Sequence, residues 1–124
     1  MPTIFVGSAA AGTPYLVGDQ TRGKGVVSGL PVDASGVCTG GGLEQNPGFK
    51  VGSNPTAIIA FAGGLIVSDE TYGDDANSSV WSTDLVGKGQ CQADAGGRAC
   101  CHLALHPSGT LVAAANYLGE APAI

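Results

Sequence analysis

The chain has 124 residues, which is enough for one domain or for part of one. Its 21 glycines exceed twice the usual share of ~7%, and charged residues make up only 12%, which excludes coiled coils and long isolated helices. A net charge of −5 with only five Lys and Arg argues against nucleic-acid binding, and no apolar run approaches the ~20 residues of a membrane span.

Short apolar runs separated by Gly, Pro, Asn, Asp and Ser predict β-strands along most of the chain. In chain order the expected strands are Thr3–Val6, Val26–Leu30, Thr56–Ala60, Leu65–Asp69, Val80–Asp84, Leu103–Leu105 and Leu111–Ala115. The stretches Asp33–Gly36 and His106–Gly109 predict tight turns, since each ends in a glycine that can adopt a positive φ. No window of a dozen residues without Gly or Pro carries a helical stripe, so the expected fold class is all-β.

An internal repeat relates residues 54–70 to residues 100–116. One offset of 46 residues aligns the two stretches without a gap and pairs Leu65 with Leu111 and Glu70 with Asn116. Each copy is expected to form a strand, a glycine turn and a second strand. Periods of about 40–50 residues with four strands each are typical of β-propeller blades. The repeat therefore predicts a partial β-propeller, and an all-β sandwich with similar hairpins is the alternative.

The repeat period also bears on how much of a propeller the chain contains. At 46 residues per blade, 124 residues supply two to three blades, whereas propellers close into rings of about 4–8 blades. We therefore expect residues 1–124 to be the N-terminal part of a single propeller domain. An incomplete ring leaves strand edges open, which predicts self-association through those edges.

The four cysteines, Cys38, Cys91, Cys100 and Cys101, favour free thiols, with disulfides as the alternative. Their spacing lacks the two close pairs of a four-cysteine zinc site, so no metal is expected. The N-terminus has neither the charged region nor the apolar region of a secretory signal, and the expected compartment is the cytoplasm.

Several stretches, in order, resemble one known family. They are Ile4–Gly7, Gly25–Gly36, Asn54–Glu70, Ser79–Asp84 and, most specifically, Cys101-His-Leu-Ala-Leu-His-Pro-Ser-Gly-Thr-Leu-Val-Ala-Ala-Ala-Asn-Tyr117. The family is that of the seven-bladed lactonase propellers, which include bacterial-type 6-phosphogluconolactonase and the fungal carboxymuconate-lactonizing enzymes. The resemblance spans nearly the whole chain but only about the first third of a full family member.

The resemblance implies an activity, which is hydrolysis of 6-phosphogluconolactone to 6-phosphogluconate in the oxidative pentose phosphate route. It implies a sugar lactone as the substrate and neither a metal nor an organic cofactor. The remaining ligand-binding residues of the family come from later blades, so this chain alone is expected to be inactive. The alternatives are a non-catalytic propeller that serves as a protein-binding platform and a carboxymuconate-type lactonizing enzyme.

Three residues are candidates for the lactonase chemistry. His102 is the expected general base, because an imidazole can accept a proton near neutral pH; the alternative is a histidine that caps a strand end. Glu70 matches the family's glutamate and could orient the base or bind sugar hydroxyls, and the alternative is an ordinary solvated carboxylate. Asn116 could donate its amide to a lactone oxygen or a sugar hydroxyl, and the alternative is local closure of a strand.

Overall fold

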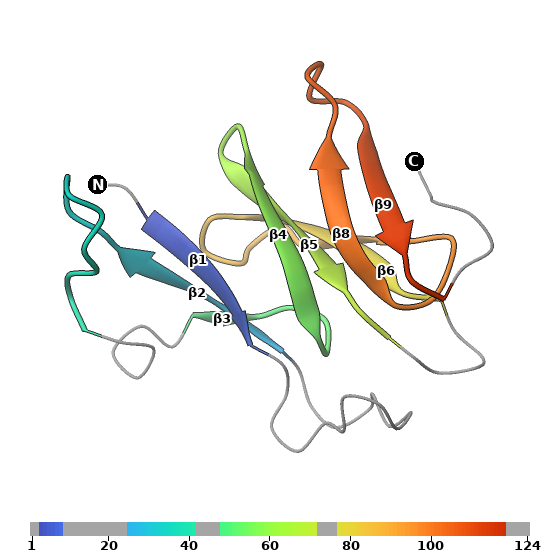
Figure 1. Cartoon of the computed structure of the whole chain (residues 1–124), viewed down its shortest axis with the longest axis horizontal. Helices are drawn as coiled ribbons and strands as arrows, with labels where there is room; N and C mark the ends of the chain where they lie inside the picture. The colour runs from blue at the N-terminus through green and yellow to red at the C-terminus, as the bar shows by residue number, and fades with distance from the viewer. Residues whose placement is uncertain (1–2, 9–24, 42–47, 72–76, 119–124) are drawn as a thin grey trace.

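The computed structural model describes residues 3–8, 25–41, 48–71 and 77–118 (Figure 1). These residues form strands, turns and irregular segments and include no helix. The strands are β1 (Thr3–Ser8), β2 (Val26–Pro31), β3 (Phe49–Lys50), β4 (Pro55–Phe61), β5 (Gly64–Asp69), β6 (Ser79–Asp84), β7 (Cys91–Asp94), β8 (Cys100–Leu105) and β9 (Val112–Asn116). The expectation of an all-β fold is confirmed for this part of the chain.

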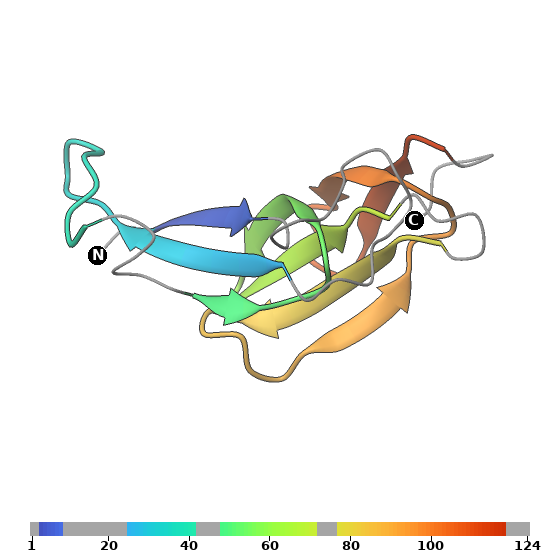
Figure 2. The same ribbon diagram turned by 90° about the horizontal axis from the view of Figure 1, so that it is seen from below.

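The strands form three antiparallel sheets in which each strand pairs with its neighbours in sequence. The first sheet is β1-β2-β3, the central sheet is β4-β5-β6-β7, and the third sheet is β8-β9. The sheets follow one another across the molecule, with the central sheet between the other two (Figures 1 and 2). The first strand of the central sheet, β4, contacts both β1 and β8.

Within the central sheet, β5 buries both of its faces because apolar residues lie on both sides of this strand. Every residue of β5 is buried, and neighbouring residues on a strand point to opposite faces. Leu65 and Val67 pack with Val27 of β2 on one face. Ile66 packs on the other face with Leu103 of β8 and Ala114 of β9, among others. Fully burying each large aliphatic side chain contributes about 1.5–3 kcal/mol, so β5 is the centre of the core.

All seven expected strands are present, with bounds that differ by up to three residues. Both expected tight turns are also confirmed: Gly36 and Gly109 have φ values of +84° and +73°, and their N–H groups donate to the carbonyls of Asp33 and His106. Two strands were not expected. β3 has only two residues, and β7 is exposed throughout its length, so neither has an apolar pattern that predicts a strand.

The repeat is present in the fold, but the single offset of 46 residues is wrong. Pro55 pairs with Asp69 as Cys100 pairs with Asn116, which places the first strands 45 residues apart and the second strands 47 apart. A backbone bond from Glu70 N to Asn54 O recurs from Tyr117 N to Ala99 O, each 2.9 Å.

The difference in offset comes from the length of the turns. Phe61 pairs with Gly64 around two residues, whereas the His106 N–H donates to Leu111 O around four residues. The true counterpart of Asn116 is therefore Asp69, and not Glu70.

Candidate functional site

The three expected site residues come from the ends of three strands. Glu70 directly follows β5, His102 lies near the start of β8, and Asn116 ends β9. The end of β5, the start of β8 and the end of β9 lie toward the same edge of the sheets (Figure 1). The Thr56 hydroxyl at the start of β4 donates to the Cys100 carbonyl at 3.1 Å, which joins the central and third sheets at this edge.

His102 is exposed beside an irregularity in β8. The register of the β8–β9 ladder shifts between Cys100 and His102, and both Cys101 and His102 are exposed. Leu103, the next residue, is buried against the central sheet. Because side chains alternate along a strand, the imidazole lies on the face of β8 that points away from that sheet. The ring is therefore accessible from solvent.

Glu70 is buried, with only 4% of its surface exposed. Its backbone N–H donates to Asn54 O at 2.9 Å, and its carbonyl accepts the Asn54 side-chain amide at 3.2 Å. The Asn54 side chain is itself buried, so this pair fixes the chain where β5 ends. The alternative of an ordinary solvated carboxylate at Glu70 is therefore wrong.

Asn116 is held at the end of β9 with one side of its amide occupied. Its Nδ2 donates to Ala95 O at 2.7 Å, whereas its buried Oδ1 has no hydrogen-bond partner among the described residues. Gly97 lies directly against this side chain, since a Cβ there would be 2.8 Å from the Asn116 Nδ2. The expected role of Asn116 is donation, but its Nδ2 is already used, and the group left without a partner is the Oδ1 acceptor. An unsatisfied buried oxygen is unfavourable by about 1–3 kcal/mol unless a donor reaches it.

Cys100 lies near all three expected site residues, and the sequence patterns did not identify it as part of the site. Its Cα pairs with Asn116, and its thiol is fully buried. Burial raises the pKa of the thiol, the neighbouring Cys101 and the charge of Glu70 raise it further, and the His102 backbone N–H lowers it. A thiol with a raised pKa is a poor nucleophile, so Cys100 has a packing role.

Two buried polar side chains, those of Asp69 and Ser78, accept backbone hydrogen bonds at the same edge of the sheets. Sequence patterns did not predict this role. Asp69 Oδ1 accepts the N–H groups of Ser53 and Asn54 at 3.0 and 2.8 Å. Ser78 Oγ accepts the Thr71 N–H at 3.1 Å and the Cys100 N–H at 3.0 Å. Asp and Ser between strands ordinarily indicate turns, and here they satisfy buried backbone donors.

The described residues hold no group of three or more His, Cys, Asp or Glu side chains able to bind a metal ion. All four cysteines are free; Cys38, Cys91 and Cys101 are exposed. No described segment is a helix with the length and hydropathy needed to cross a membrane. The chain matches no family model, no curated protein and no solved structure.

Proposed function

We propose that the chain forms part of a lactonase-type β-propeller that hydrolyses 6-phosphogluconolactone. The observation that carries the proposal is how the chain passes from sheet to sheet. The chain leaves the first sheet from β3, the last strand of that sheet, and enters the central sheet at β4, the first strand of that sheet. It passes from β7 of the central sheet to β8 of the third sheet in the same way. Propeller blades are linked in this manner around a central axis.

The packing of the central sheet also supports a propeller over a sandwich. A two-sheet sandwich packs one face of each sheet and leaves the other face in solvent. Here Leu65 and Val67 contact the first sheet, while Ile66 and Val80 contact the third. The structural repeat maps Leu65 to Val112 and Val67 to Ala114, and this same face of the third sheet contacts the central sheet. The central sheet thus presents one face to the preceding sheet and the other to the following sheet, which is the arrangement expected of a blade in a ring.

In the proposed reaction, His102 takes a proton from water while the water oxygen bonds to the lactone carbonyl carbon. The ring C–O bond then breaks, and the proton passes to the departing ring oxygen, which yields the open sugar acid. Asn116 faces the central sheet, on the opposite side of the third sheet from His102, so the sugar would reach its unpartnered Oδ1 around the strand ends, where the buried Glu70 also lies. A ring needs about 4–8 blades, so full activity requires more channel wall than three sheets supply.

The test uses the two histidines of the chain as probe and control. Both lie on the third-sheet hairpin and are exposed, His102 at the expected site and His106 in the turn. In proton NMR, added 6-phosphogluconate is expected to shift the ring signals of His102 but not those of His106. Replacement of Asn116 by Ala is expected to weaken the shift. Equal effects on both histidines, or no effect on either, would contradict the proposal.

Two further ligands separate the alternatives. Gluconate lacks the phosphate, so an equal response to gluconate argues against a phosphosugar substrate. A response to a muconolactone, with none to 6-phosphogluconate, favours the carboxymuconate type. A chain that binds none of the three, but binds protein through its apolar surfaces, fits the platform.

A further inference from the structure

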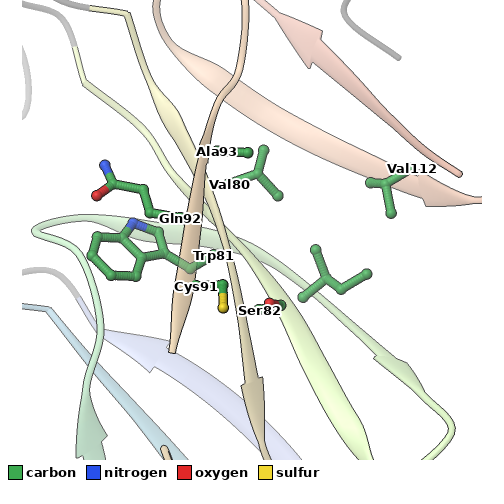
Figure 3. A pocket seen from close by; sticks show the side chains of 8 residues that line it. Val80, Trp81, Ser82, Cys91, Gln92, Ala93 and Val112 are labelled. Carbon is green, nitrogen blue, oxygen red and sulfur yellow. The ribbon is translucent and has the colours of Figure 1, made fainter. Parts of the chain in front are cut away.

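An apolar pocket of about 250 Å³ lies between the central and third sheets (Figure 3), and His102, Glu70 and Asn116 are not among the residues that line it. Its lining includes Ile66, Val80, Ala93 and Val112. In Figure 3 the side chain of Val80 points toward Val112, and the indole of Trp81 extends on the other side of the sheet. Ile66, Val80 and Val112 also belong to the core between these sheets, so the pocket continues an existing interface.

The interface between the first and central sheets shows what fills an equivalent position. The ladders of the two sheets correspond: Val27 pairs with Phe49 as Val80 pairs with Ala93. Their backbone junctions correspond as well, with Gly25 N donating to Gly52 O as Ser78 N donates to Gly97 O.

The correspondence extends to the rest of the pocket. Ser8 pairs with Val26 as Asp69 pairs with Ser79, which maps Phe5 of β1 to Ile66 of β5. The repeat of the hairpins maps Leu65 to Val112. The four counterparts of the lining residues are therefore Phe5, Val27, Phe49 and Leu65.

The four counterparts belong to one apolar cluster, and Trp81 of β6 packs against that cluster. Trp81 is held opposite Val67 in the ladder between β5 and β6. In the third sheet, the counterpart of Val67 is Ala114 on β9, and β9 pairs only with β8 among the described strands. The pocket between the central and third sheets therefore corresponds to the space that Trp81 fills between the first and central sheets.

We propose that this pocket is a docking site for an extended polypeptide strand that pairs antiparallel with β9 and places an aromatic side chain opposite Ala114. The volume suits one ring, since a dry cavity of ~150 Å³ already holds benzene. Strand addition supplies backbone hydrogen bonds, and the pocket supplies selectivity for the aromatic residue. The proposal rests on the repeat of the sheets and is independent of lactone hydrolysis.

Cys91 provides a chemical handle for the test, because it is exposed and lines the pocket. Cys38 and Cys101 are replaced by Ser, so that Cys91 is the exposed thiol. The protein is equilibrated under mildly reducing conditions with a peptide that carries residues 78–84 (SSVWSTD) and a terminal cysteine on a short flexible linker. The control peptide has Ser in place of the tryptophan. Mass spectrometry measures the disulfide formed with each peptide.

The tryptophan peptide is expected to be captured about tenfold more than the control, since the pocket buries part of the indole away from water. The substitution Ala93→Glu places a charge on the pocket face and is expected to abolish the preference. Gln92 also borders the pocket, but its side chain points to the Trp81 side of the sheet in Figure 3, so Gln92→Glu is expected to preserve the preference.

Equal capture of the two peptides would overturn the proposal, as would a preference that survives Ala93→Glu. Sedimentation then identifies the other occupant. If the chain dimerises and Ala93→Glu makes it monomeric, a second copy fills the pocket and the proposed strand ligand is wrong.

Discussion

Replacement of Asp69 by alanine is expected to destabilise the protein by about 4 kcal/mol. The carboxylate is 7% exposed, and its Oδ1 accepts two backbone N–H groups, from Ser53 and Asn54. Removal of the acceptor leaves both donors without it, and each buried unsatisfied donor costs about 1–3 kcal/mol. A domain of this size has a total stability of about 5–15 kcal/mol, so the loss would be a large fraction of it.

The assay is urea unfolding, followed by the fluorescence of Trp81, the only tryptophan in the chain. Ser79 links that tryptophan to Asp69, since Ser79 Oγ accepts the indole N–H at 3.0 Å and lies 3.4 Å from Asp69 Oδ2. Far-UV circular dichroism therefore serves as a second probe of the same transition. Asp69→Asn retains an acceptor oxygen and is expected to lose less stability than Asp69→Ala.

Asp33 is the matched control. Its Oδ1 also accepts two backbone N–H groups, those of Ser35 and Val37, but the turn is exposed. Water can replace the carboxylate there, so Asp33→Ala is expected to have a much smaller effect. If Asp33→Ala destabilised the protein as much as Asp69→Ala, burial would not be the origin of the effect and the reasoning would be refuted.

Four further predictions test the core and its edge. Leu65→Ala removes a fully buried side chain and is expected to cost about 2–5 kcal/mol in urea unfolding; a loss below 1 kcal/mol would place Leu65 outside the core. Gly52→Ala is expected to destabilise more than Gly63→Ala, because both have positive φ but only a Cβ at Gly52 meets Asp69, at 2.6 Å; equal thermal shifts would contradict this. Cys100 is expected to react with a thiol reagent far more slowly than the three exposed cysteines, and four equal rates would show that it is accessible. The pKa of Cys100 is raised in the folded state, so the thiol's contribution to stability is present below the ordinary thiol pKa of 9.0 and is lost as pH rises through the folded value. Urea unfolding of the unchanged protein and of Cys100→Ala at several pH values checks this.

The strands that sequence patterns predicted are those whose side chains pack on neighbouring sheets. β5 is apolar on both faces because it lies between two sheets, and its Leu-Ile-Val run indicates a strand directly. β7 is held by its ladder with β6 and has four exposed residues, so no hydrophobic pattern marks it. Its position depends on backbone pairing with a strand elsewhere in the chain, which composition does not encode.

The candidate site was predicted only in part, because burial depends on which strand ends meet. The pattern identified Glu70 as the residue after a strand, but its burial follows from the contact with Asn54 and the proximity of Cys100. The sequence also aligned Glu70 with Asn116, since a gapless match cannot detect two additional residues in a turn. The ladders and the repeated backbone bonds assign Asp69 to that position instead.

The reassignment means that Asp69 and Asn116 occupy the same position in successive hairpins, where their side chains have different roles. In the central sheet, Asp69 lies against Gly52 and accepts two backbone N–H groups, so its oxygen is fully used for structure. In the third sheet, Asn116 lies against Gly97, directs Nδ2 to a carbonyl and leaves Oδ1 buried without a partner among the described residues. A buried acceptor without a partner calls for a donor, such as a ligand hydroxyl or an ordered water. The contrast between the two hairpins therefore supports Asn116, more than Glu70, as the residue that a hydroxyl of the proposed sugar substrate would contact.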